Sequence, residues 1–356
     1  MINVLVVEAL IAERELLVRT LGSDEQIKVV GVAQDGVEAL EAVRRFRPDV
    51  IVMALRLPKM NGLEASRRIM ETDPCPIVLV RGSHASEMAS ETFDAMGTGA
   101  LAVLPSPVDS DHPDDEAARA LVQTVKLMSE IRVVRRWPRR QQTTAVIRPI
   151  TTPPSVAPGK LRVVVIGAST GGPPALHALL AGLPRTFPIP ILIVQHMASG
   201  FIQGFVDWLG QCTSLPIRVA QRGDLLLAGQ IYVAPDGCQM IINKMDRVVL
   251  TNDGPENGLR PAVSYLFRSV AEVYGSGVIA ILLSGMGRDG AVELAALKER
   301  GAITMAQDKV SSVVHGMPGE AIKLNAARYI LPPDEMAEVL VRLVSHGDHR
   351  AKGVSA

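Results

Sequence analysis

Aromatic side chains and cysteines are both scarce in this chain of 356 residues. Aromatic residues make up 3% of the sequence, although 47% of it is hydrophobic, so aliphatic side chains must fill the cores. The three cysteines, Cys75, Cys212 and Cys238, are scattered and form no CxxC pair. Their number and spacing argue against a disulfide framework and a zinc ribbon, and they predict a reducing, cytoplasmic setting without a metal or other cofactor.

The sequence also lacks an excess of charge of either sign. Lysine plus arginine number 37, as do aspartate plus glutamate, so nothing favours nucleic acid or an anionic membrane as a partner. No uncharged apolar run reaches the roughly 18 residues that a membrane-spanning helix needs. The start, MINVLVVEAL, has no basic segment before its apolar run and predicts a first strand instead of a signal peptide. We therefore expect a protein that is neither membrane-embedded nor bound to nucleic acid.

The length favours two domains, and the first part alternates short β-branched runs with amphipathic segments. The runs NVLVV, IKVVGVA, DVIVMAL, PIVLV and ALAVLP predict strands, and ERELLVRTL, GVEALEAVRRF and GLEASRRIMET predict helices between them. This alternation is typical of a doubly wound parallel α/β sheet of the flavodoxin-like kind. A last helix is expected from Asp114 to about Arg135.

A linker and a second α/β pattern follow. The segment PRRQQTTAVIRPITTPPSVAPGK, residues 138–160, is rich in proline and threonine and has no apolar periodicity. From Leu161 the apolar runs RVVVIGA, IPILIVQH, IRVA, QIYVAP, RVVLT, GVIAILLSG and ITMAQD predict a second doubly wound, Rossmann-like sheet. We expect a first domain over residues 1–120, a helix end and linker over 121–160, a second domain over 161–345, and a flexible tail over 346–356.

The turn after the first strand of the second domain, in VVVIGASTGGPPAL, suits either a phosphate or a nucleophile. A dinucleotide fingerprint needs GxGxxG and an acidic residue at the end of the next strand. Here Gly167, Gly171 and Gly172 have the wrong spacing, and the next apolar run ends in Gln195 and His196. No lysine follows the glycines as in a P-loop, so the pattern excludes a nucleotide site of either kind.

Three residues at strand ends remain as candidates for nucleophilic catalysis: Ser169, His196 and Asp289. Taken singly, each has a structural interpretation, because a serine there often caps a helix and an aspartate often closes a turn. The carboxyl ends of parallel strands share one edge of a sheet, where ligands bind. Together the three residues predict a Ser-His-Asp triad, which is defined by geometry and not by sequence order.

Five separated motifs in this region also carry a family resemblance. The segments GASTGGP, VQHM, GDLLLAGQIYVAPDG, LSGMGRDGA and AQDKVSSVVHGMP resemble the catalytic domain of chemotaxis protein-glutamate methylesterases, from Leu161 to about Leu343. The resemblance implies hydrolysis of glutamate methyl esters, and deamidation of glutamines, on the cytoplasmic helices of methyl-accepting chemoreceptors. It also implies an N-terminal response-regulator receiver, which the first domain resembles, and a chemotaxis histidine kinase as a possible signalling partner.

The resemblance also implies roles for particular residues. Ser169 would be the nucleophile, His196 the general base, and Asp289 the residue that fixes the imidazole tautomer. The backbone N–H groups of Thr170 and Met286 would form the oxyanion hole.

The sequence departs from the family pattern in one segment of the second domain. Family members often read HRPSVD where this chain has GLRPAVS. Leu259, Ala262 and Ser264 thereby replace polar groups. We expect this change to affect substrate range or the anchoring of this loop, and to leave the triad intact.

The first domain departs from its family at the residues that carry phosphoryl chemistry. A working receiver has an acidic pair after its first strand, a phosphorylated aspartate after the third, a hydroxyl after the fourth and a lysine after the fifth. This chain has Glu8 and Ala9, then Ala54, Arg81 and Leu104 at the positions assigned to them. The pattern predicts a pseudo-receiver with no phosphoacceptor.

Neighbouring charges do not restore this chemistry. Asp49 opens its strand and is expected at the opposite edge of the sheet from Ala54. Arg81, in preference to Arg56, is expected to form an ion pair with Glu8 that locks the receiver in one state.

The leading hypothesis is thus a methylesterase and glutaminase that is regulated independently of receiver phosphorylation. One alternative is a non-enzymatic signalling scaffold that acts through the pseudo-receiver. Another is a serine esterase for a different ester. Release of methanol from methylated receptor distinguishes the three.

Overall fold

The computed structural model describes residues 1–81, 102–107, 115–129, 161–197 and 200–345. The chain divides into two compact units, Met1–Ala145 and Val146–Ala356. The expected linker over residues 138–160 and the expected tail over 346–356 lie outside the described residues. In the described part of the chain, no helix combines the length and the apolar character needed to cross a membrane.

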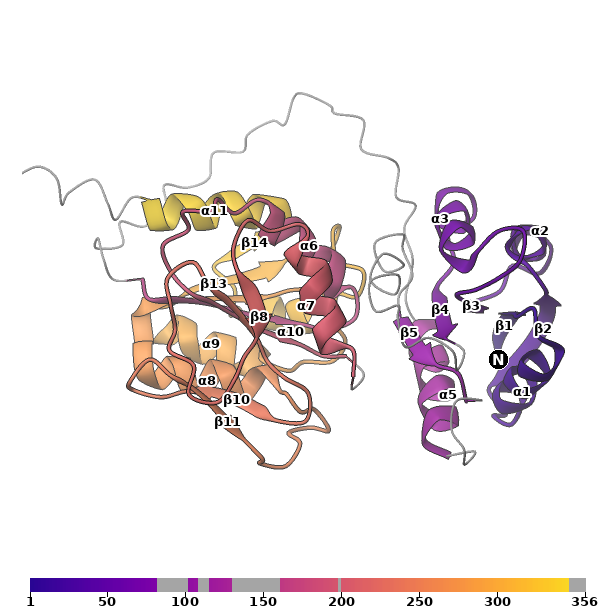
Figure 1. Ribbon diagram of the computed structural model, residues 1–356, viewed down its shortest axis with the longest axis horizontal. Helices are drawn as coiled ribbons and strands as arrows, with labels where there is room; N and C mark the ends of the chain where they lie inside the picture. Colours follow the sequence, from indigo (N-terminus) through magenta and orange to yellow (C-terminus); the bar gives the residue numbers. More distant parts are fainter. Residues whose placement is uncertain (82–101, 108–114, 130–160, 198–199, 346–356) are drawn as a thin grey trace, which may run out of the picture. The chain divides into compact units, whose positions relative to one another are not determined.

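The first unit is a five-stranded parallel sheet with intervening helices (Figure 1). The strand order is β2-β1-β3-β4-β5, which confirms the doubly wound, flavodoxin-like fold predicted for this region. Its elements are β1 (Ile2–Val7), α1 (Ile11–Gly22), β2 (Ile27–Ala33), α2 (Gly36–Phe46), β3 (Val50–Ala54), α3 (Gly62–Thr72), β4 (Ile77–Arg81), β5 (Ala102–Pro105) and α5 (Asp115–Ser129).

Helix α5 belongs to the core of this first unit. Leu121, Val125 and Met128 are buried and recur at the spacing of one helical face. The boundary expected at residue 120 therefore falls inside this helix, and the unit extends at least to Ser129. Only packing shows which residues of the helix are held by the sheet, and the proline- and threonine-rich segment further along the chain lies outside the described residues.

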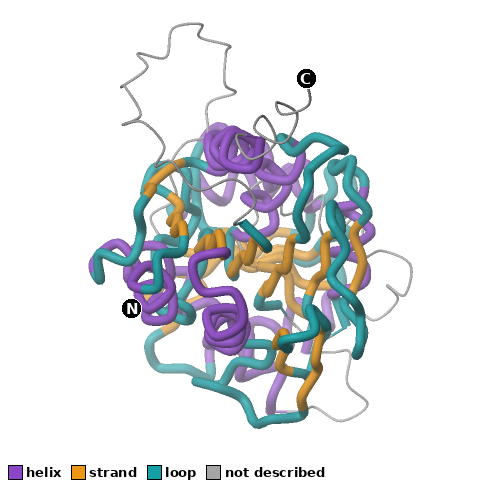
Figure 2. Tube along the Cα trace, turned by 90° about the vertical axis from the view of Figure 1, so that its left-hand side faces the viewer, coloured by secondary structure: helices purple, strands orange, loops and turns teal. Residues whose placement is uncertain are grey.

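The second unit is built around a seven-stranded parallel sheet in the order β14-β13-β12-β6-β7-β9-β8. Helices cover both faces of the sheet (Figure 2), as expected for a doubly wound domain. Its elements are β6 (Val163–Ala168), α6 (Gly172–Ala181), β7 (Ile191–Gln195), α7 (Ile202–Gly210), β8 (Ile217–Val219), β9 (Ile231–Val233), β10 (Gln239–Ile242), β11 (Val248–Thr251), α8 (Val263–Tyr274), η2 (Gly275–Gly277), β12 (Val278–Leu282), α9 (Ala291–Glu299), β13 (Ile303–Gln307), α10 (Met317–Lys323), β14 (Tyr329–Leu331) and α11 (Pro333–Ser345).

The seven apolar runs expected in this unit all form strands, but one of them lies outside the main sheet. The run RVVLT becomes β11, which pairs antiparallel with β10 as a separate two-stranded sheet. Strands β10 and β14 were not expected. Each is short: β10 has four residues and β14 has three, and β14 is only partly buried at the sheet edge.

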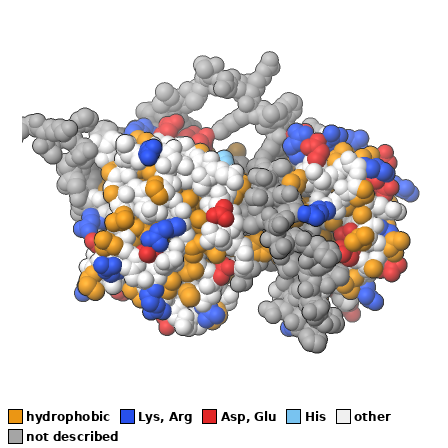
Figure 3. Space-filling model, in the orientation of Figure 1, with side chains coloured by type: hydrophobic (Ala, Val, Ile, Leu, Met, Phe, Trp, Pro, Cys, Tyr) orange, Lys and Arg blue, Asp and Glu red, His pale blue; other side chains and the backbone are white. Residues whose placement is uncertain are grey.

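Every residue of β6, β7, β12 and β13 is buried, since helices cover the sheet on both sides. These four strands lie side by side in the middle of the sheet, so the residues after their carboxyl ends meet at one edge. On the face of this unit that Figure 3 shows, Lys and Arg side chains are interspersed with Asp and Glu, which agrees with the balanced composition of the chain.

Candidate active site

Ser169 directly follows β6, the central strand of the seven-stranded sheet. Its N–H donates to the carbonyl oxygen of Ser284 at 3.0 Å, and its carbonyl accepts the N–H of Gly172, the first residue of α6, at 2.8 Å. Between them Gly171 has φ of 76°, and a Cβ there would lie 2.4 Å from Cβ of Val313. Only glycine fits this close turn, which fixes Ser169 at the carboxyl edge.

His196 lies at the same edge because it directly follows β7, the neighbour of β6. Its N–H donates to the carbonyl oxygen of Ala168 at 2.9 Å. The buried side-chain amide of Gln195 joins the two catalytic candidates further, because its Nε2 donates to the carbonyl oxygens of Ser169 at 2.9 Å and His196 at 2.8 Å. Main-chain and amide hydrogen bonds thus set the positions of both residues.

Asp289 comes from the loop between β12 and α9 and contacts the imidazole of His196. Its Oδ2 lies 3.0 Å from Nε2 of His196, and the two side chains are 3% and 9% exposed. The same carboxylate accepts the N–H groups of Val263 at 2.6 Å and Ser264 at 3.0 Å. These are the first two residues of α8, so Asp289 also caps that helix from another part of the chain.

The ionisation of Asp289 decides which nitrogen of His196 is basic. Burial is the largest influence and opposes ionisation, but hydrogen bonds from His196, Ser264 and the N–H of Val263 outweigh it and hold the pKa of Asp289 below its usual value. An ionised carboxylate can only accept, so Nε2 of His196 carries the hydrogen and Nδ1 keeps its lone pair. The available base is therefore Nδ1.

The hydroxyl of Ser169 is not yet engaged by this base. Among the described residues, no hydrogen bond joins the Ser169 hydroxyl to His196. Such contacts are often long in the absence of substrate, and a serine hydroxyl turns freely about its Cα–Cβ bond. The predicted residues are thus gathered at one edge, with the His196–Asp289 contact formed and the Ser169–His196 contact open.

The backbone N–H groups of Thr170 and Met286 are those expected to form an oxyanion hole. Within the described residues, neither Thr170 nor Met286 donates its backbone N–H to a main-chain or side-chain oxygen. Thr170 follows Ser169 directly, and Met286 follows Gly285, where an added Cβ would lie 2.9 Å from Cβ of Ser169. Both amides therefore lie near Ser169 and donate to no oxygen in the described part of the chain.

Ser284 and Gln307 hold this arrangement together and were not singled out from the sequence. The fully buried Ser284 hydroxyl lies 2.8 Å from the carbonyl oxygen of Thr170 and accepts the N–H of Val314 at 2.9 Å. Oε1 of Gln307 accepts the N–H of Ser284 at 2.7 Å. The only sequence feature that could have pointed to Gln307 is its position as a polar residue at the end of an apolar strand, and Gln195 has the same feature.

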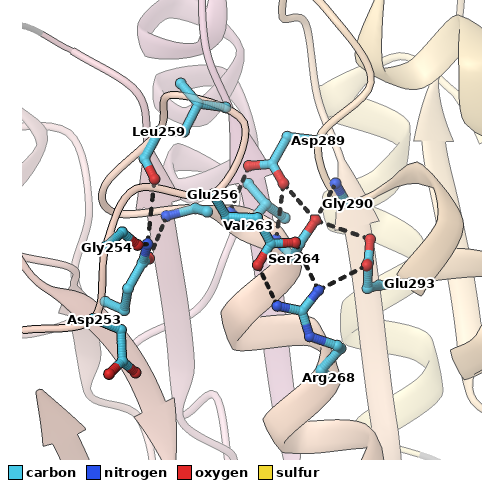
Figure 4. Close-up of polar contacts among 12 residues, drawn as sticks. Asp253, Gly254, Glu256, Leu259, Val263, Ser264, Arg268, Asp289, Gly290 and Glu293 are labelled. Atoms are coloured by element: carbon cyan, nitrogen blue, oxygen red, sulfur yellow. Dashed lines mark hydrogen bonds and ion pairs between the residues drawn. The ribbon is translucent and has the colours of Figure 1, made fainter. Parts of the chain in front are cut away.

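The segment that departs from the family pattern is anchored through its backbone. The side chain of Gln239 donates to the carbonyl oxygens of Gly254 and Leu259, each at 3.2 Å, and accepts the N–H of Ala262 at 2.8 Å (Figure 4). Because these contacts use main-chain groups, the apolar side chains of Leu259 and Ala262 do not remove them. Ser264 keeps a polar contact of its own, to Asp289.

In the first unit, Ala54 ends β3 and is buried, while Asp49 precedes that strand and accepts the N–H of Asn3 at the opposite edge. Glu8 follows β1 and is 4% exposed. Burial raises the pKa of Glu8, although its carboxylate accepts the N–H of Leu10 at 2.9 Å.

Of the receiver positions, Leu104 differs from the expectation, and the side chain of Arg81 is not described. Leu104 does not follow the fifth strand as expected; it lies inside β5, paired with Val80, and the first residue after the strand is the buried Ser106. The strand ends at Pro105, as the run ALAVLP does, so Leu104 was assigned to a position inside the expected strand. The side chain of Arg81 lies outside the described part of the chain, so its pairing with Glu8 stays a prediction.

Comparisons with known proteins match both units. Residues 164–340 match the CheB methylesterase family, and residues 4–112 match the response regulator receiver domain family. A protein-glutamate methylesterase/protein-glutamine glutaminase of Nitrosospira multiformis is 54% identical over 346 residues, which cover 97% of this chain and 98% of that one. A protein of Geobacter metallireducens with the same name, numbered 4, is 50% identical over 345 residues, with coverages of 96% and 99%.

A solved structure also resembles the second unit. The catalytic domain of the Thermotoga maritima CheB methylesterase is 36% identical, with a TM-score of 0.50, and covers 52% of this chain and 99% of its own. Similarity to named proteins therefore extends over nearly the whole chain, and similarity to a solved fold includes the unit that carries Ser169.

Proposed function

Because the chain belongs to the family of protein-glutamate methylesterases/protein-glutamine glutaminases, we propose that it hydrolyses glutamate methyl esters on chemoreceptors as a serine hydrolase. The proposed substrates are the cytoplasmic helices of the receptors, which would place the enzyme in the cytoplasm. Deamidation of receptor glutamines is proposed for the same site. A chemotaxis histidine kinase is a candidate partner.

The observation that carries this proposal is the hydrogen bond between His196 and Asp289 beside the turn that holds Ser169. In the first step, the Ser169 hydroxyl attacks the ester carbonyl and gives its proton to Nδ1 of His196. Asp289 stabilises the imidazolium that forms. The negative charge on the carbonyl oxygen is stabilised by the unused N–H groups of Thr170 and Met286.

The next steps regenerate the enzyme. His196 returns its proton to the leaving methoxide, so methanol departs and the glutamyl group stays as an ester on Ser169. A water molecule then gives a proton to His196 and attacks the acyl carbon. As the bond from the acyl carbon to the Ser169 oxygen breaks, His196 returns this proton to that oxygen, which frees the glutamate product and restores Ser169 and neutral His196. With a glutamine substrate the leaving group is ammonia, and the second half of the reaction is the same.

The test is methanol release from methylated receptor by the full chain and its variants. Ser169→Ala and His196→Ala should each lower turnover by several orders of magnitude, because the members of a triad act as a unit. Ser345→Ala, at the exposed end of α11, is the matched control and should keep full activity. Near-normal demethylation by Ser169→Ala would refute the nucleophile assignment.

The same assay separates the alternatives. A signalling scaffold would release no methanol and would be insensitive to Ser169→Ala. An esterase for another ester would hydrolyse a small activated ester in a Ser169-dependent way and leave methylated receptor untouched.

We also propose that the first unit is a pseudo-receiver and that regulation of the enzyme does not depend on its phosphorylation. Three features support this: buried Ala54 at the strand end, Ser106 in place of a cation after β5, and a buried Glu8 whose raised pKa makes it a poor ligand for magnesium. A phosphoryl group would lack both a carboxylate to attach to and the cations that neutralise it.

A further inference from the structure

The hydroxyl of Ser264 lies between two carboxylates (Figure 4). Its Oγ is 2.5 Å from Oδ1 of Asp289 and 2.9 Å from Oε2 of Glu293. The N–H of Gly290 donates to the same Oγ at 3.1 Å. Ser264 is 4% exposed, so water competes little for these contacts.

A serine hydroxyl has one hydrogen and can donate it to only one acceptor at a time. When Glu293 is ionised, its oxygen competes with Asp289 for that hydrogen. When a hydrogen-bond donor replaces the ionised oxygen of Glu293, Oγ of Ser264 accepts from that donor as well as from the N–H of Gly290. The hydroxyl hydrogen of Ser264 is then always donated to Asp289. The hydrogen bonding of the triad aspartate therefore depends on a second carboxylate.

Arg268 fixes the orientation of Glu293. Nη1 of Arg268 donates to Oε1 of Glu293 at 3.0 Å, and the same guanidinium binds both carboxylate oxygens of Glu256. Oε1 is thus committed to Arg268, and Oε2 is the atom that faces Ser264 (Figure 4). The charged groups that face this cluster are Asp289, Arg268 and Glu256.

We propose that Glu293 is a positioning residue that sets the basicity of His196 through the Ser264 hydroxyl and Asp289. This inference rests on the triad of the proposed function. By drawing the hydroxyl away, Glu293 leaves Asp289 with fewer donors and more charge to stabilise the imidazolium of His196. Two side chains, Ser264 and Asp289, connect Glu293 to His196 through successive hydrogen bonds.

The test is a double-mutant cycle in the full chain, with the pKa of His196 followed by NMR titration of its ring protons. In Glu293→Gln, Arg268 holds Oε1, so Nε2 of the amide faces Ser264 and donates to it. The hydroxyl then donates to Asp289 permanently, and the pKa of His196 should fall by about half a unit to one unit, the scale of one hydrogen bond.

The Ser264 variants decide whether the hydroxyl carries the effect. In a Ser264→Ala background, Glu293→Gln should lower the pKa of His196 by less than half as much, because only the through-space loss of charge remains. Ser264→Thr keeps a hydroxyl and should restore the full response. Equal shifts with serine and alanine at position 264 would overturn the relay.

Glu256→Gln is the matched control, since it removes an equal charge from the same arginine without touching Ser264. Its shift should be much smaller than that of Glu293→Gln, and an equal shift would also overturn the proposal, even if the Ser264→Ala protein did not fold. The pH profile of kcat/KM should move with the NMR value. Because the titration needs no turnover, it remains interpretable if Ser169→Ala refutes the proposed reaction.

Discussion

At the scale of single residues, Glu8 carries a charge that its surroundings disfavour. It lies almost wholly inside the first unit, and burial raises the pKa of its carboxyl above the usual 4.5. A folded state that binds the proton more tightly is stabilised most below pH 4.5, and this contribution is lost as the pH rises through the higher, folded-state value. At neutral pH an ionised Glu8 thus costs stability.

Replacing Glu8 by a neutral isostere should therefore stabilise the first unit. Glu8→Gln keeps an oxygen for the N–H of Leu10, and the gain at pH 8 should be on the order of 1 kcal/mol, typical of buried polar groups. Thermal unfolding at pH 4 and pH 8 checks this, since the gain should vanish at pH 4. Glu15→Gln on the exposed face of α1 should change little at either pH. A gain that did not grow with pH would contradict the raised pKa.

Residue positions could be predicted from the sequence where they follow from strand ends. His196 and Asp289 come together because each follows a buried parallel strand, and such strands are readable as apolar runs. The contribution of Gln195 could not be predicted, because its amide bonds depend on where two carbonyl groups lie in space. The roles assigned to the catalytic candidates stay predictions until they are tested.

At the scale of elements, both main sheets were predictable, but the short strands β10 and β14 were not. Strands covered on both faces must be continuously apolar, whereas β10 begins with Gln239, whose amide holds a neighbouring loop. The run ALAVLP ends at Pro105, as β5 does, but the expected lysine position was assigned to Leu104, inside the strand, and not to Ser106, the first residue after it.

Helix α8 has a candidate active-site residue as its N-terminal cap, with a consequence for stability. No side chain at its own start, after Ala262, accepts from its first N–H groups; Asp289 does so instead. Asp289→Ala should therefore lower the free energy of unfolding by about 1–3 kcal/mol, the cost of a lost cap together with unpaired buried donors.

Ser169→Ala is the comparison for this effect, because it removes a hydroxyl that makes no hydrogen bond to His196 among the described residues. It should leave the melting temperature of the second unit nearly unchanged. Calorimetry of both variants checks the difference. Equal melting temperatures would mean that water or a rearranged loop replaces the Asp289 carboxylate as the cap.

At the scale of the whole molecule, the expected outcome is an enzyme that ignores phosphoryl donors. Incubation with acetyl phosphate and magnesium should leave the intact mass and the rate of methanol release unchanged, because Ala54 has no oxygen to phosphorylate. Ala54→Asp supplies that oxygen without the magnesium and lysine positions, and should gain little phosphate. An acid-labile gain of one phosphoryl group by the unaltered chain would contradict the pseudo-receiver.

Asp289 contacts His196 and also caps α8, and this affects which residues can change when such an enzyme loses its activity in evolution. Ala54 ends β3 with a buried methyl group, so the strand forms there without a carboxylate. Asp289 cannot drift so freely, because a chain that lost it would also lose the cap of α8. We expect a homologue that has lost catalysis to keep Asp289, because folding depends on it, and to lose Ser169 first. In a survey of related sequences, Ser169 is thus the residue whose presence or absence distinguishes an active enzyme from an inactive homologue.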